Sequence, residues 1–191
     1  MAAIKRASGI PTIDVSMVTI TAGLDPEFGF DTANKIGVEV QTEEVAAVKL
    51  VVKGILRAQK PATSTITGHK ITLTDNMFNA DLVVLLQGGV VEYDAIETDL
   101  VVGYTPPLAG ASNVVEPFIL AAYSAQYDAS GSIVRYEKIS YPNCTGMPIA
   151  FSSEDGAFRV PEYVINSAPN TGEAPYVITY VATTALPTFM S

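Results

Sequence analysis

The sequence predicts a mainly β fold, of the sandwich or barrel type, that carries one short α-helix. Apolar and polar residues alternate along several segments, as in residues 70–74, where Ile71 and Leu73 fall on one face. Turn-forming clusters such as residues 128–131, Asp-Ala-Ser-Gly, separate these segments. Residues 76–87 are the exception, because their apolar residues follow a helical spacing.

The composition favours one assembling domain. A chain of 191 residues fits a single domain, 1–191, and 48% of the residues are hydrophobic. Only 16% are charged, compared with roughly 25% in an ordinary soluble domain. Such a chain is expected to bury surface against other subunits as well as in its own core.

The charge balance disfavours two classes of partner. The formal net charge is −9, from 20 acidic and 11 basic residues. Nucleic acids and anionic membranes are bound through clusters of Lys and Arg, so neither is an expected ligand. Cys144 is the only cysteine, and the first residues lack the apolar stretch of a secretory signal. We therefore expect synthesis in the cytoplasm.

Residues 44–58 are predicted to form one half-buried strand. Alternation places two sets of residues on opposite faces: Ala46, Val48, Leu50, Val52 and Leu56 on one, and Lys49, Lys53 and Arg57 on the other. Gly54 is expected to form a bulge, and residues 67–69, Thr-Gly-His, a turn before the next strand.

The second half of the chain reads as further strands. Residues 118–127 and 133–141 are predicted to pair as a long hairpin around the turn at 128–131. Residues 152–156 provide another turn signal. The Val-, Ile- and Tyr-rich residues 174–184 are predicted to close the fold as a strand.

The helix is expected at about residues 76–87. Its apolar stripe consists of Phe78, Leu82, Leu85 and Leu86. Asp75, Asn76 and Asn79 are the possible N-caps, and Gly88 with Gly89 suits a left-handed termination. A buried strand is the alternative, because the β-branched Val83 and Val84 are poor helix formers.

Some parts of the chain show no strand or helix pattern. They are an extended N-terminal segment, a long loop at about residues 22–35 and a C-terminal segment. Aromatic side chains on such segments either fold back on the core or insert into a neighbour. The candidates for inter-subunit contact are Leu24, Phe28, Phe30, Tyr104, Leu186 and Phe189.

No catalytic or cofactor-binding motif is recognisable. His69 is the only histidine and is expected beside a strand, while Cys144 is expected to be a small buried side chain. One His and one Cys cannot fill a zinc shell. The acidic run Glu92, Asp94, Glu97 and Asp99 lacks the spacing of a calcium loop. We therefore predict no enzyme, no metal and no cofactor.

Several segments, in order, resemble the tail tube (major tail) proteins of long-tailed bacteriophages. They are "KITLTD" followed by "ADLVVLLQGG", then "YEKISYPNCTGMPIAF", then "DGAFRVPEYVINSAPNTGEAPYVITYV", and "LP" near the C-terminus. The similarity covers roughly residues 66–187, whereas the first third contributes no motif.

The resemblance implies a structural virion protein of the phage tail. Its fold would be a β-sandwich flanked by one helix, and copies would form hexameric rings that stack into a hollow tube. DNA would pass through the lumen from capsid to host without specific binding. The other partners would be tail proteins such as the tape measure and the terminator, and no membrane is involved. Residues 22–35 are, by location, the expected contact loop between rings.

Two alternatives stay open. The first is another non-enzymatic β-sandwich module, such as a capsid decoration, pilin-like or carbohydrate-binding protein. The second is a hydrolase that uses carboxylates alone, drawn from Glu137, Glu162 and the run from 92 to 99, provided that two of them approach within roughly 5–10 Å.

Overall fold

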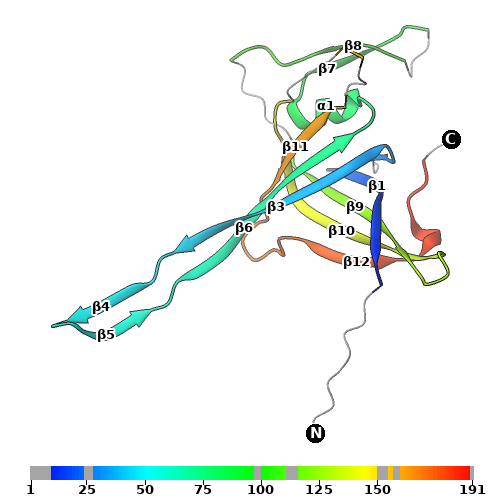
Figure 1. Cartoon of the computed structure of the whole chain (residues 1–191). Coiled ribbons are helices and arrows are strands. Elements are labelled where there is room, and N and C mark those ends of the chain that lie inside the picture. The colour runs from blue at the N-terminus through cyan, green and yellow to red at the C-terminus, as the bar shows by residue number, and fades with distance from the viewer. Residues whose placement is uncertain are drawn as a thin grey trace.

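The computed structural model describes residues 10–23, 28–96, 100–110, 116–149, 155–156 and 160–189. Within these ranges strands dominate, and the predicted mainly β fold with one short α-helix is confirmed (Figure 1).

The strands run antiparallel to their neighbours and form one large sheet and two hairpins. The large sheet contains β1 (Thr12–Ala22), β2 (Phe28–Phe30), β3 (Ala33–Val45), β6 (Thr63–Asp75), β9 (Phe118–Tyr127), β10 (Ile133–Gly146), β11 (Glu162–Ser167) and β12 (Val177–Val181). The hairpins are β4 (Val48–Val52) with β5 (Ile55–Lys60), and β7 (Val90–Tyr93) with β8 (Val101–Thr105). The helices are α1 (Ala80–Gln87) and the 3₁₀ turn η1 (Thr183–Ala185).

The large sheet has the order β2-β1-β9-β10-β11-β6-β3. Strand β10 has two neighbours on its second edge, β12 beside residues 136–140 and β11 beside residues 144–146. Between them β10 changes register, and Asn143 has a positive φ of 47°. Its side-chain Nδ2 donates to the Ala168 carbonyl at 2.5 Å, which holds the strand in this bend.

The two ends of the sheet face one core. Val18 and Ile20 of β1 belong to the same buried cluster as Ile71 of β6 and Tyr163 of β11. Because β1 and β6 are separated by several strands in the sheet order, the sheet must curl around this cluster. The result is a two-layered, sandwich-like β fold closed at one end by α1 (Figure 1).

The outer face of β1 and β9 is also covered. Met17, Ala121 and Tyr123 form a second small cluster, against which Val181 and Leu186 pack. The C-terminal segment thus lies against the side of the sheet that faces away from the main core.

Helix α1 is confirmed, but it begins four residues later than the predicted position 76. Asn79 is the N-cap, with extended backbone angles and its side-chain oxygen accepting from the Leu82 amide at 3.1 Å. Leu82, Val83 and Leu86 are fully buried against the sheet. Gly88 ends the helix with a positive φ of 75°, as the pair of glycines predicts.

The predicted hairpin of residues 118–141 and the closing strand are confirmed as β9–β10 and β12. Asp128 organises the hairpin turn, since its Oδ1 accepts from the Ser130 and Ser132 amides at 2.8 and 2.9 Å. Most of the predicted turn at 152–156 lies outside the described residues.

The prediction for residues 44–58 is wrong. They form the end of β3, all of β4 and the start of β5, and no residue of β4 or β5 is buried. Gly54 is not a bulge. It follows Lys53 in a two-residue turn, with positive φ values of 77° and 53°, as in type I′ hairpins. A two-residue turn interrupts the alternation of the strands only briefly, so the sequence pattern resembles one continuous strand.

The predicted turn at Thr67-Gly68-His69 is also wrong, because these residues lie inside β6. The pairing with β3 shifts there, with Gln41 opposite Gly68 and Thr42 opposite Ile66. A side chain on Gly68 would collide with the Ser167 carbonyl, so the glycine serves close strand packing instead of a turn.

Candidate self-association surfaces

A two-stranded arm extends from the sheet and is exposed on both faces. We define the arm as residues 39–67: the outer part of β3, the hairpin β4–β5 and the first part of β6 (Figure 1). Every residue of the arm is exposed. At roughly 3.3 Å per residue, strand residues 39–52 would span about 45 Å if straight.

The exposed residues of the arm are strongly apolar. Its large exposed side chains are Val40, Val45, Val48, Leu50, Val51, Val52, Ile55, Leu56 and Ile66. An isolated two-stranded ribbon in water is marginally stable at best. The arm therefore has the composition of a surface that is covered in an assembly.

Charge along the arm is segregated. All the acidic residues of the arm, Glu39, Glu43 and Glu44, lie near the body, while all the basic ones, Lys49, Lys53, Arg57 and Lys60, lie on the outer hairpin. The end of the arm is therefore cationic in a chain whose net charge is −9.

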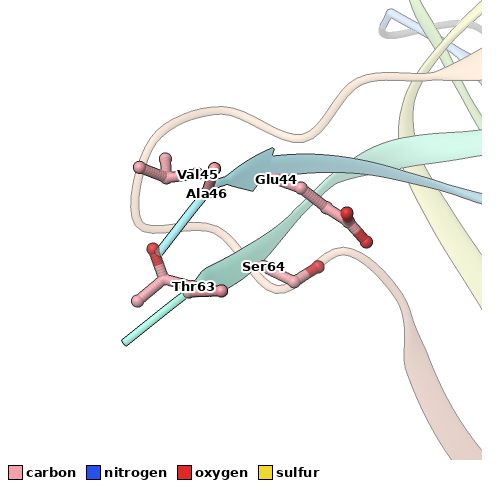
Figure 2. A pocket seen from close by; sticks show the side chains of 6 residues that line it. Glu44, Val45, Ala46, Thr63 and Ser64 are labelled. Carbon is pink, nitrogen blue, oxygen red and sulfur yellow. The ribbon is translucent and has the colours of Figure 1, made fainter. Parts of the chain in front are cut away.

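The arm is interrupted between its inner and outer parts. Cross-strand pairing stops at Val45 opposite Thr63 and resumes at Val48 opposite Lys60, so residues 46–47 and 61–62 are unpaired. Figure 2 shows the shallow hollow that results, about 310 Å³ in volume, with Glu44 and Ser64 among the residues that line it. Pro61, which has no amide hydrogen, reinforces the break.

A second feature is an acidic pocket at the N-terminal end of α1, which we call the aspartate pocket. Its volume is about 330 Å³. It is lined by Gly29, Phe30, Asp31, Thr32, Asp75, Met77, Phe78, Asn79, Ala80, Asp81, Val101 and Phe189. The lining contains three aspartates and no basic residue, and the exposed Met77 and Phe189 give it an apolar rim.

Asp75 is the unusual member of this pocket. It is fully buried, and its Oδ1 accepts from the Met77 amide at 3.3 Å. Its Oδ2 has no hydrogen-bond partner among the described residues. A buried carboxylate oxygen without a partner is costly, so a nearby positive charge would stabilise it.

The exposed aspartates lie on two sides of the pocket. Asp31 follows β2, and Asp81 lies in the first turn of α1. There its negative charge interacts favourably with the positive end of the helix dipole and stabilises the helix. Asp81 Oδ1 accepts from the Tyr93 hydroxyl at 2.5 Å, and this hydrogen bond raises the pKa of Tyr93.

The structure distributes five of the six predicted contact residues between the core and the surface. Phe30 and Phe189 are brought together in the aspartate pocket. Phe28 packs on the core 6.2 Å from the Phe30 ring, and Leu186 packs on the second cluster. Tyr104 donates to the Gly88 carbonyl at 2.6 Å and locks β8 to the end of α1. Leu24 lies outside the described residues.

The predicted contact loop 22–35 follows the body of the protein where it is described. Phe28–Phe30 pairs with β1 as strand β2, and Ala33 already belongs to β3. The long projecting element is the arm. Sequence reasoning missed it because the exposed apolar residues of β4 and β5 follow the pattern of a half-buried strand. The Lys53-Gly54 pair was the available signal of a turn.

His69 and Cys144 lie inside the protein. His69 is buried, with its ring in edge-to-face contact with Tyr141 and Tyr176 at 5.4 and 5.5 Å, and burial lowers its pKa below 6.5. Burial also raises the pKa of the Cys144 thiol to about 11, which keeps it protonated and unreactive at neutral pH.

Glu137 and Glu162, two of the carboxylates considered for hydrolysis, are not brought together. Gly146 of β10 is opposite Ile165 of β11, so Glu162 lies beyond the end of β10, far from Glu137 on its first half. Glu97 and Asp99 lie outside the described residues, and Asp94 accepts from the Ile96 amide at 2.7 Å. Across the described ranges, no three His, Cys, Asp or Glu residues are placed to hold a metal ion. No helix in those ranges has the length and hydropathy to cross a membrane.

No protein-family model and no curated protein sequence matches the chain. Among solved structures, it is similar to a chain of the sheath–tube complex of an extracellular contractile injection system in the extended state. That match has 12% identity and a TM-score of 0.43, over 90% of this chain and 92% of the other.

Two further similar chains come from an anti-feeding prophage. One belongs to its tube-terminating cap, with 15% identity, a TM-score of 0.42 and coverage of 93% and 95%. The other belongs to its baseplate, with 8% identity, a TM-score of 0.35 and coverage of 94% and 98%. With TM-scores below 0.5, these likenesses do not establish a function for this chain.

Proposed function

We propose that this chain is a single-domain structural subunit of a phage-type tail tube. Copies associate as hexameric rings, and the rings stack into a hollow tube through which DNA passes. The chain performs no catalysis in this role, and its partners are other copies of itself and further tail proteins.

The arm is the observation that carries the proposal. It is a long apolar ribbon with both faces exposed, and none of the described residues covers it. In water such a surface promotes association. A subunit that polymerises must bury surface of this kind against its neighbours.

The open edges of the sheet support the same function. The pairing order leaves the outer edges of β2 and β3 without a partner strand among the described residues, and every residue of β12 except Val181 is exposed. Unpaired strand edges are templates for pairing with another chain. Neighbouring copies in a ring would satisfy them.

The charge and the sequence order also agree with a DNA conduit. The net charge of −9 gives like-charge repulsion toward DNA over a screening length of about 8–10 Å. The strand that leads into a short helix, on which the resemblance to tail tube proteins rests, is present as β6 followed by α1.

The proposal is tested by electron microscopy of the purified full chain at rising concentration. Hollow rods built of six-fold rings are expected. A chain that stays monomeric up to its solubility limit contradicts the proposal. A closed globular complex would instead favour a capsid decoration protein or another binding module.

A further inference from the structure

We propose that the apex of the arm, Lys53 with the side chains beside it, docks into the aspartate pocket of a second copy. This inference rests on the proposed self-association and identifies the two surfaces that meet. The pocket receives one lysine side chain with its apolar neighbours.

The pocket attracts a cation. Its lining holds Asp31, Asp75 and Asp81 and no basic residue. The fully buried Asp75, which also lines the pocket, has an oxygen without a hydrogen-bond partner among the described residues, so a hydrogen-bond donor that enters the pocket would stabilise it. A lysine ammonium beside the exposed carboxylates of Asp31 and Asp81 would offset part of their negative charge and supply charge-assisted hydrogen bonds.

The arm apex matches the pocket in shape and chemistry. Lys53 is the first of the two turn residues, so its side chain leaves the arm at the very end. Val52 and Ile55, which pair across the turn, are 43% and 56% exposed and suit the apolar rim formed by Met77 and Phe189. A pocket of about 330 Å³ holds one or two side chains and not the whole hairpin.

The occupant is a second copy because the arm cannot reach its own pocket. The arm points away from the body, whereas the pocket lies at α1, at the opposite end of β6 (Figure 1). The two surfaces are different, so the contact is heterologous. Contacts of this type either close into rings or propagate as open filaments, and both occur in a stacked tube.

A charge exchange tests the contact. Lys53→Glu and Asp31→Lys change exposed side chains, so each variant should keep the thermal stability of the unmodified chain. Each single variant is expected to lower the association constant between copies at least about tenfold, as removal of a close charge pair does. The double variant should associate more tightly than either single variant, because it restores one opposite-charge pair, but less tightly than the unmodified chain, because Asp75 and Asp81 stay in the pocket.

Lys60→Glu is the matched control. It makes the same charge change on the same hairpin, but at the end of β5 far from the apex. It is expected to leave association within about threefold of the unmodified chain. An equal loss in Lys60→Glu and Lys53→Glu would show a general charge effect and overturn the apex contact.

Carbodiimide cross-linking of the unmodified chain provides a direct readout. This reagent joins a lysine amine to a carboxylate with no spacer, and mixing isotopically light and heavy chains identifies links between copies. Links from Lys53 to Asp31 or Asp81 are expected. If the chain assembles but these links are absent and Lys53→Glu assembles normally, the docking proposal fails and the proposed function stands. If the unmodified chain does not associate, both fail.

Discussion

Shortening the arm should strongly weaken self-association while leaving the body folded. Val45 and Thr63 are direct partners, so residues 46–62 can be replaced by Asn-Gly, the two-residue turn preferred in tight hairpins. The variant keeps every described core residue, because none lies within the replaced segment. It loses the outer hairpin with its apolar and cationic side chains.

The size of the effect follows from exposure. The removed hairpin carries six large apolar side chains that are 43–63% exposed. Burying such a side chain completely is worth about 1.5–3 kcal/mol, so covering the exposed half is worth roughly 1 kcal/mol each, or about 6 kcal/mol per arm. Ordering the side chains opposes this by roughly half. We therefore expect association at least about a hundredfold weaker.

Sedimentation velocity over a concentration series measures the association, and thermal unfolding followed by circular dichroism checks the body. The exchange Val51→Thr with Leu56→Thr, at two paired positions of the hairpin, is a graded control that keeps strand-forming residues and should give an intermediate loss. A shortened chain that still assembles like the original would refute the argument. So would one that unfolds, since the arm would then support the body.

Three further predictions concern the body. Asn79→Ala removes the helix cap and should lower the free energy of unfolding, measured in urea, by about 1 kcal/mol. Asn79→Asp can still cap the helix, so its free energy of unfolding should stay near that of the original chain. Equal losses in the two variants would contradict the capping role. The pKa of buried His69 is lowered below 6.5, so the unfolded state binds more protons and the free energy of unfolding should fall as the pH drops through 6.5. His69→Phe should flatten that part of the pH profile. If the variant shows the same difference in unfolding free energy between pH 7.5 and 5.5 as the original chain, this prediction is contradicted. With the pKa of its thiol raised to about 11, Cys144 should react with a thiol reagent at pH 8 only after unfolding, and rapid labelling of the native chain would show that it is accessible.

Much of the body could be predicted from local patterns. The alternation of β6 gives the buried faces of Ile71 and Leu73 correctly, and the Asp128 turn gives the β9–β10 hairpin. The helix was predictable because its apolar spacing, its Asn79 cap and its glycine termination agree with one another. Only its start was misplaced, since three polar residues competed for the cap position.

The arm could not be predicted, because alternation reports that one face of a strand is apolar and not what covers it. Leu50 and Val52 carry the same signal whether they pack on their own core or on a neighbour. The small turn at Lys53 and Gly54 lacks the Asn or Asp that marks most type I′ hairpins, which hid the reversal of the chain.

The aspartate pocket was only half visible in the sequence. Phe30 and Phe189 were expected at contacts because they are aromatic residues in segments without regular structure, and both line the pocket. Asp31, Asp75 and Asp81 come from three separate elements, and only the three-dimensional fold brings them together. Asp75 suggested nothing more than a helix cap, because burial cannot be read from a single polar residue.

The break in the arm at residues 46–47 and 61–62 has a mechanical meaning. Residues 46–47 and 61–62 join the outer hairpin to the inner ribbon without strand pairing, while each part keeps its own pairing. Fewer hydrogen bonds therefore resist bending at this point than elsewhere in the arm. If copies of the chain contact one another through the ends of their arms, bending at this break would let a filament curve while each docked surface keeps its contacts. In the proposed tail tube, the unpaired residues of the arm would then allow the tube to bend without opening gaps between subunits.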